Sequence, residues 1–159
     1  MIQASAVWRR HLAAAALLAA STIVRAAEPA AYLESYPRAS AMIETTRACL
    51  ILDLYLAATP EQRAQGLMFI RNLGEYEGML FLTSKPAPVS MWMKNTYISL
   101  DMLFIEANGR IVGIAAGTTP LSEATITAPM PVTGVLELAG GFAARHGVRA
   151  SDRFTRIGE

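Results

Sequence analysis

The sequence predicts a mainly β domain at the margin of the α+β class: a compact β sandwich or partly closed barrel with two short helices. Three observations favour this fold class. The chain contains six or so short apolar runs, turn-forming residues separate them, and the two helix-like segments are brief. Its 159 residues are enough for one domain with a hydrophobic core and too few for two.

The first 26 residues are predicted to be a secretory signal peptide. Arg9, Arg10 and His11 provide a basic start, residues 12–24 form an apolar run, and Val24-Arg25-Ala26 offers small residues at a cleavage site. A transmembrane helix needs ~20 apolar residues, and this run is shorter. The sequence therefore predicts an exported protein, periplasmic or extracellular, cleaved near Ala26 and without stable membrane insertion afterwards. A retained membrane anchor is the alternative.

The remaining chain divides into a tether and one domain. Residues 27–47 mix Ala, Pro, Ser and Tyr without periodicity and are interpreted as a tether, whereas residues 48–159 form a single β-rich domain. Cleavage would remove three arginines and leave 11 basic against 13 acidic side chains. A nucleic-acid-binding protein needs a concentrated basic face, so no nucleic-acid partner is expected.

Histidine and cysteine are scarce. The predicted mature chain has one of each, His146 and Cys49. An internal disulfide or a multi-ligand zinc site within one chain is therefore excluded. His146 is interpreted as the polar end of a short helix, just before Gly147. The methionines could form a copper site or pack in the core. Core packing is favoured, so no metal and no cofactor are expected. The methionines concerned are Met68, Met79, Met91 and Met93.

Local patterns predict the elements of the first half of the domain. The alternation over 49–57 is typical of a strand with both faces largely covered. A helix is expected to begin after Thr59, because Pro60 suits the first helical position and Gln62 completes a capping box. It should end at Gly66. The run 78–82 then reads as a buried strand.

The second half contains the clearest turn signal. Residues 91–96 are expected to be extended because of their aromatic and β-branched content. The apolar runs 100–106 and 110–115 are joined through Asn108-Gly109, which predicts a hairpin with a tight type I′ turn. The later elements are expected to be a long loop over 117–133, a strand over 134–138, a short helix over 139–146 and a closing strand over 152–156.

Polar side chains embedded in these apolar strands are the candidate functional residues. Alternation along an extended 91–96 segment would put Trp92, Lys94 and Thr96 on one face and Met91, Met93 and Asn95 on the other. Trp92 offers a stacking surface, and Lys94 a charge for a carboxylate or phosphate. The alternative is structural, with Lys94 paired to Asp101 or Glu137. The candidate ligand-binding residues are Trp92, Lys94, Asn95, Thr96, Asp101 and Glu137.

Six short motifs occur in the order and spacing of a known family. They are Gly66-Leu67-Met68, Gly78-Met79-Leu80-Phe81, Trp92-Met93-Lys94-Asn95-Thr96, Leu100-Asp101, Val135-Leu136-Glu137-Leu138 and Asp152. On these motifs, residues 48–156 resemble the family called domain of unknown function 192, also described as an uncharacterised ACR. The resemblance implies a compact β-rich fold and frequent export, and it implies no particular reaction.

Three kinds of function follow from these patterns. The leading hypothesis is a small binding or interaction module of the cell envelope with a pocket around Trp92–Asp101, because polar residues interrupt apolar strands there. An envelope hydrolase that uses Lys94 with Asp101 or Glu137 is the enzymatic alternative, and an envelope scaffold is the third. The partner would be an unidentified small molecule or an envelope protein.

Overall fold

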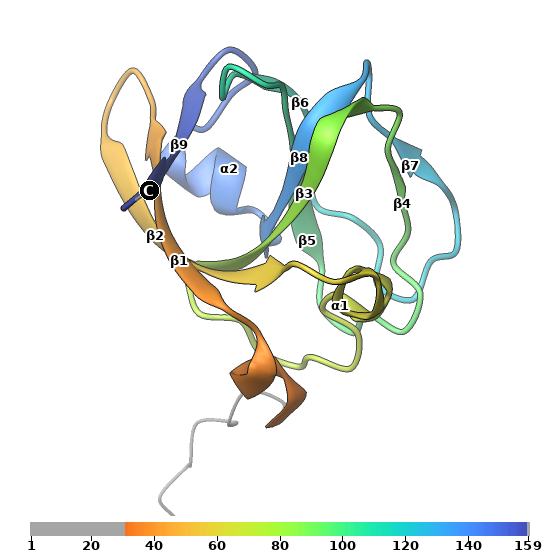
Figure 1. Ribbon diagram of the computed structural model, residues 1–159. Helices are drawn as coiled ribbons and strands as arrows, with labels where there is room; N and C mark the ends of the chain where they lie inside the picture. The colour runs from red at the N-terminus through yellow and green to blue at the C-terminus, as the bar shows by residue number, and fades with distance from the viewer. Residues whose placement is uncertain (1–30, 159) are drawn as a thin grey trace, which may run out of the picture.

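Residues 31–158 are described by a computed structural model, in which a seven-stranded sheet curls into a half-barrel (Figure 1). The order of the strands in the sheet is β6-β5-β8-β3-β2-β1-β9, and β4 and β7 form a separate two-stranded sheet. The predicted mainly β, partly closed barrel is thus confirmed. None of the helices within these residues is long and apolar enough to span a membrane. The predicted signal peptide lies outside the described residues.

The strands run as follows: β1 Arg38–Glu44, β2 Cys49–Ala57, β3 Glu77–Ala87, β4 Ser90–Met91, β5 Leu100–Ile105, β6 Ile111–Ala115, β7 Ile126–Thr127, β8 Val132–Ala139 and β9 Arg153–Ile157. The helical elements are the 3-10 helix η1 Ala31–Ser35, α1 Pro60–Gln65 and α2 Phe142–His146. Among the neighbouring pairs, β2 and β3 run parallel and the others antiparallel. The parallel pair requires a crossover, and α1 lies in it.

The capping box predicted for α1 is present. The backbone N–H of Gln62 donates to the Thr59 hydroxyl at 3.2 Å, and the Thr59 N–H donates to the Gln62 side chain at 3.1 Å. Gly66 terminates the helix at a φ of 50°, a conformation that favours glycine. The expected start and stop of this helix are therefore confirmed.

The segment expected to be a tether contains ordered elements. Residues 31–35 form η1, and β1 pairs with β2 on one side and with β9 on the other. The sequence of this segment, a mixture of Ala, Pro and Ser, did not indicate β1. The strand is stabilised by pairing with distant parts of the chain, and such pairing leaves no local periodic signal. A tether over all of 27–47 is therefore wrong from residue 31 onward.

The hairpin between β5 and β6 forms, but its turn is not type I′. Gly109 has a positive φ of 84°, whereas Asn108 does not, and the Gly109 N–H donates to the carbonyl of Glu106 at 2.9 Å. This is the geometry of a longer loop with a single left-handed glycine. A Cβ at Gly109 would lie 2.3 Å from the carbonyl oxygen of Phe154. Glycine is therefore needed for the turn to approach β9.

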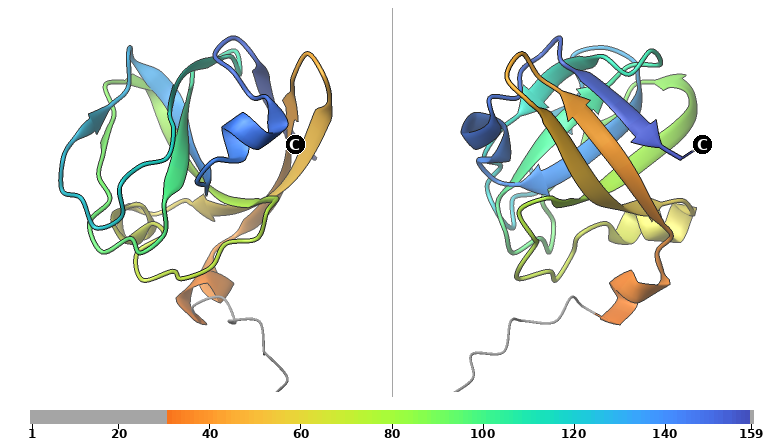
Figure 2. Two further views of the ribbon diagram at one scale, coloured as in Figure 1. Left: turned by 180° about the vertical axis from the view of Figure 1, so that it is seen from behind. Right: turned by 90° about the vertical axis from the view of Figure 1, so that its left-hand side faces the viewer.

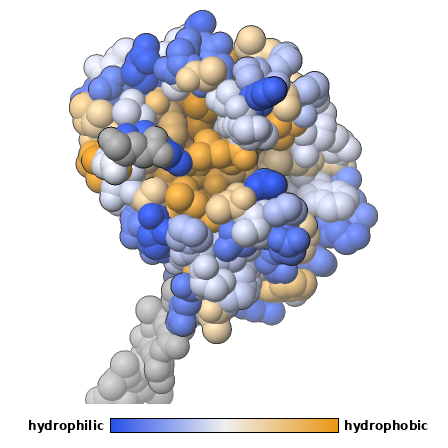
Figure 3. Space-filling view, viewed as in Figure 1, coloured by the Kyte–Doolittle hydropathy of each residue, from blue (hydrophilic) through white to orange (hydrophobic). Residues whose placement is uncertain are grey.

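That close approach partly closes the barrel. The Phe154 N–H donates to the Gly109 carbonyl at 2.7 Å, and Arg110 forms an isolated bridge with Arg153. The two edges of the sheet, β6 and β9, therefore meet through the hairpin turn, as the two views in Figure 2 show. The space-filling view shows apolar side chains gathered in a hollow in the middle of one face of the molecule (Figure 3).

Two hydrophobic clusters occupy the two faces of the central strands. The inner cluster contains Phe142 of α2 with residues of most strands, including Leu80, Leu103 and Leu136. The outer cluster is covered by η1, the β4–β7 sheet and the adjoining loops, and it includes Met79, Met102 and Val135. Every residue of β5 is therefore buried. A polar side chain on β3, β5 or β8 must face one cluster or the other.

Candidate functional site

Four of the six candidate residues line one small pocket on the outer face of the sheet. Trp92, Lys94, Thr96 and Glu137 surround it together with residues 63–68 at the end of α1. Its free volume is about 30 Å³, which is room for a water molecule or two or for the end of a ligand. The pocket unites the first and third motifs of the sequence with β8. Its role in binding stays a prediction.

The Trp92–Thr96 segment is a turn rather than an extended strand. Strand β4 ends at Met91, and the Thr96 N–H donates back to the Met93 carbonyl at 3.1 Å. Asn95 has a positive φ of 55°, which asparagine tolerates better than most residues. The expected alternation is therefore wrong. Trp92 is 51% exposed, whereas Met93 and Thr96 are buried.

Asn95 positions the pocket wall and does not line the pocket. Its carbonyl accepts a hydrogen bond from the Phe69 N–H at 2.8 Å. Its side-chain amide lies 3.8 Å from the Met68 sulfur, a weak contact. Both contacts join the Lys94-Asn95 turn to the loop after α1, so Asn95 helps to fix the distance between the two sides of the pocket.

Glu137 is the buried acid of the pocket. It lies on β8, paired with Met79 of β3 and Met102 of β5, both fully buried in the outer cluster. Glu137 is only 4% exposed, and its carboxyl group has no hydrogen bond or ion pair with residues 31–158. No side-chain N or O atom of these residues is both sealed from solvent and without a partner, so the Glu137 oxygens open onto the pocket that the residue lines. Burial among these apolar neighbours raises the pKa of Glu137 to about 8. The side chain is therefore mainly protonated at neutral pH.

Two cationic side chains, Arg63 and Lys94, line the rim of the pocket. Arg63 of α1 donates to the Ala58 carbonyl at 2.8 Å. Lys94 lies 3.9 Å from Glu123, a partly exposed pair, and its Nζ is 5.4 Å from the centre of the Trp92 ring. An exposed pair at that distance contributes little energy, so Lys94 can turn toward a ligand at little cost.

An apolar groove adjoins the pocket. The two share the lining residues Arg63, Phe81 and Met91, and the groove has a free volume of about 210 Å³. Its apolar lining comes from Phe81, Leu82, Val89, Met91 and Val135. A narrow polar pocket beside a larger apolar groove is typical of a site for a small molecule with one polar end.

Tyr32 holds the pocket wall in place by hydrogen bonding. No sequence pattern indicated this role. Its hydroxyl donates to the Met68 carbonyl at 2.5 Å and lies 3.3 Å from the Gly66 carbonyl. Burial raises the pKa of Tyr32 to about 12. A hydrogen bond with the Gln65 side chain opposes this shift, and the charges of Tyr36 and Glu137 add to it. Tyr32 falls in the expected tether, where no local pattern marked it as structured.

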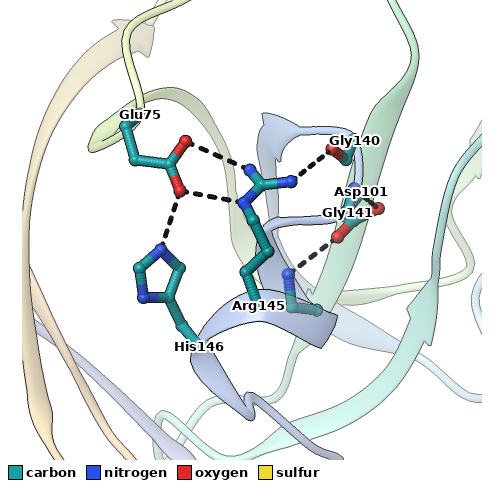
Figure 4. A network of polar contacts seen from close by, with 7 residues as sticks. Glu75, Asp101, Gly140, Gly141, Arg145 and His146 are labelled. Atoms are coloured by element: carbon teal, nitrogen blue, oxygen red, sulfur yellow. Dashed lines mark hydrogen bonds and ion pairs between the residues drawn. The ribbon is translucent and has the colours of Figure 1, made fainter.

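Asp101 does not belong to this pocket. It pairs with Leu138 rather than Glu137, so its side chain faces the inner cluster, on the opposite side of the sheet. Its carboxylate accepts hydrogen bonds from the backbone N–H groups of Gly117, Gly141 and Ala143 at 2.7, 3.0 and 2.8 Å. Asp101 thus caps the start of α2 from β5 (Figure 4).

A second polar cluster surrounds the end of α2 (Figure 4). Glu75 accepts two hydrogen bonds from Arg145, each at 3.1 Å, and lies 2.8 Å from the His146 ring. These contacts, first that with His146 and then that with Arg145, lower the pKa of Glu75. His146 is the last residue of α2, as predicted, and Gly147 follows in the left-handed conformation. Residues 31–158 contain no group of three or more His, Cys, Asp or Glu side chains placed to hold a metal ion.

The fold and the pocket define a half-barrel protein with a buried acid beneath the turn that follows β4. The chain belongs to the domain of unknown function 192 family, described as uncharacterised ACR, whose model matches residues 41–155. The resemblance found in the sequence motifs is thereby confirmed.

Two solved structures are similar to this chain. One is a protein from Sinorhizobium meliloti 1021 provisionally named a transcription regulator, with 43% identity over 79% of this chain and 98% of that chain, at a TM-score of 0.76. The other is a protein of unknown function from Novosphingobium aromaticivorans, with 37% identity over 82% of this chain and 94% of that chain, at a TM-score of 0.75. No curated protein matches the chain.

Proposed function

We propose that this protein is a small-molecule-binding module of the cell envelope, and that the pocket at Glu137 with its adjoining apolar groove is the binding site. The observation that carries the proposal is the Glu137 carboxyl group, 4% exposed and without a hydrogen-bond partner among residues 31–158. The predicted signal peptide supports the location in the envelope.

A purely structural role explains Glu137 poorly. Burying a carboxyl group without a hydrogen bond costs free energy, and a leucine or methionine at this position would pack against Met79 and Met102 without that cost. The Glu137 oxygens open onto the pocket, and a carboxyl group whose pKa is strongly perturbed inside a pocket is a candidate for a functional role. A ligand group in the pocket would supply the missing partner.

The hydrolase alternative has less support. Its acid–base pair would require two groups converging on one substrate, but Asp101 and Glu137 face opposite sides of the sheet. Asp101 is also fully engaged with three backbone N–H groups. Lys94 pairs with Glu123 rather than with either acid.

The regulator name of the S. meliloti protein is not extended to this chain. A protein that binds DNA neutralises phosphates with a concentrated basic surface. Residues 27–159 carry 11 basic and 13 acidic side chains, which does not favour that activity.

The first test is binding of n-octanol, a neutral probe with a polar end and an apolar chain, followed by amide NMR of the purified protein. We expect saturable shifts confined to the groove and pocket, including Met91 and Val135. Leu82→Asp would place a charge in the groove and should weaken binding about tenfold or more. Ile51→Asp is the matched control, because Ile51 is an exposed residue that does not line the groove. Shifts scattered over the whole surface, or equal loss in both variants, would reject the binding site.

A further inference from the structure

We propose that the ligand's polar end is a carboxylate, seated between the Lys94 and Arg63 side chains and the buried carboxyl group of Glu137, all of which line one pocket. This inference rests on the proposed function and names the ligand class of the same site. It goes beyond the geometry of the groove, which favours only a ligand with an apolar portion.

The charged side chains around the pocket favour binding of an anion. Arg63 and Lys94 both line it, and each is a cation within the same small volume. Thr96, buried at 5% exposure, also lines it, and its hydroxyl donates to the Lys94 carbonyl at 3.3 Å. The one acid among the lining residues is Glu137. If that acid is neutral, the pocket has a net positive potential, which favours an anionic group.

Glu137 is protonated in the free protein because of where it lies. Its neighbours along the sheet are methionines, which neither donate strong hydrogen bonds nor carry charge. The titratable or charged groups that face the pocket are Tyr32 from η1, Arg63 from α1 and Lys94 from the turn after β4. Burial raises the pKa of Glu137, and neither cation offsets it. A protonated carboxyl can donate one hydrogen bond to a ligand carboxylate.

Proton coupling follows from this arrangement. An anionic ligand binds when Glu137 is neutral and is repelled when Glu137 loses its proton. Because the pKa of Glu137 is about 8, affinity for a carboxylate should be constant at neutral pH and fall above pH 8. A cationic ligand would show the opposite trend, with binding that strengthens as Glu137 ionises.

The test compares three probes with one chain and different ends: octanoate, n-octanol and n-octylamine. We expect octanoate to bind tightest near pH 7, and its dissociation constant to rise about tenfold between pH 7 and pH 9. The affinity for n-octanol should change little over the same range. In Glu137→Gln, which cannot ionise, the ratio of the octanoate dissociation constants at the two pH values should fall to about one.

A second variant keeps the proposal testable if Glu137→Gln does not fold. Lys94 is partly exposed, so Lys94→Ala should fold, and it should weaken octanoate at least about fivefold while changing n-octanol little. Lys85→Ala is the matched control, because Lys85 is exposed and lines neither pocket nor groove.

The outcomes separate the two proposals. If none of the three probes binds the groove, the proposed function fails and the ligand class fails with it. If n-octanol binds but octanoate has no advantage, or if n-octylamine binds tightest, the proposed function stands and the carboxylate is rejected. Persistence of the pH dependence in Glu137→Gln would reject the proton coupling.

Discussion

Strands β5 and β8 each carry one buried acid, and the two acids lie on opposite faces of the same pair of strands. Asp101 faces the inner cluster, is fully buried and accepts three backbone hydrogen bonds. Glu137 faces the outer cluster, is nearly as deeply buried and accepts none. The burial is therefore almost the same, and the hydrogen bonding is opposite.

This difference separates a structural acid from a candidate binding group. Hydrogen bonds from backbone N–H groups favour an ionised carboxylate, whereas burial without such bonds favours the protonated form. Asp101 fixes the start of α2, so its replacement should lower the free energy of unfolding. Glu137 fixes nothing by hydrogen bonding, and its removal should stabilise the protein at alkaline pH.

The largest expected effect is on the pH dependence of stability. The pKa of Glu137 is about 8 in the folded protein against 4.5 for an unperturbed glutamate, so the folded state holds this proton more tightly. Its contribution to stability is fully present below about pH 4.5 and is lost as pH rises through 8, by at most about 5 kcal/mol. Chemical denaturation between pH 5 and pH 9 should show this decline.

Glu137→Gln should remove that slope and make the protein more stable than the parent near pH 9. Glu44→Gln, an exposed change on β1, should keep the slope of the parent. If the two variants keep equal slopes, Glu137 titrates normally and the contrast with Asp101 is lost.

The next effect is the loss of the α2 cap. Asp101→Asn leaves one side-chain oxygen where two oxygens now accept three N–H groups, and its amide N–H groups would face donors. We expect destabilisation of about 3 kcal/mol, measured by denaturant unfolding at neutral pH. Asp53→Asn alters an exposed pair with Arg38 and should cost less than about 1 kcal/mol. Similar losses in both variants would contradict the structural role of Asp101.

Elements that depend on residues close together in the chain were predictable from the sequence. The sheet faces on which Asp101 and Glu137 lie were not predictable. The capping box of α1, the strand over 49–57 and the hairpin over 100–115 all depend on residues close together in the chain. The opposite faces of Asp101 and Glu137 depend on the pairing of Met102 with Glu137. A shift of one residue in that register would have placed both acids on one face, and no local pattern fixes the register.

The candidate site was predictable in part for the same reason. The motifs placed Trp92, Lys94 and Thr96 near one another, although through a strand rather than the observed turn. Tyr32 and Arg63 come from elements that only the fold brings to the pocket. Arg63 was not predicted to line the pocket because an arginine on a short exposed helix ordinarily faces solvent.

A smaller effect concerns the contact between β3 and β8 beside Glu137. A Cβ at Gly78 would lie 2.5 Å from the Glu137 carbonyl oxygen and 2.7 Å from the Leu138 side chain. Gly78→Ala should therefore push the strands apart and destabilise the protein by about 2 kcal/mol in thermal unfolding. Gly134→Ala on β8 meets its nearest atom at 3.3 Å and should cost less. An equal cost at both glycines would mean that close approach is not what Gly78 provides.

The smallest effect lies at the other end of the helix that Asp101 caps. The pKa of Glu75 is lowered by His146 first and by Arg145 second, so this exposed carboxylate stabilises the fold above its usual pKa and stops doing so as pH falls. An NMR titration should find Glu75 ionised below pH 4.5, and His146→Ala should move its pKa back upward. Arg149→Ala, an exposed change beyond the helix, should leave the titration of Glu75 where it is. Because Asp101 holds the start of α2 with buried hydrogen bonds and Glu75 holds its end with exposed ones, only the Asp101 variant should lower the melting temperature clearly.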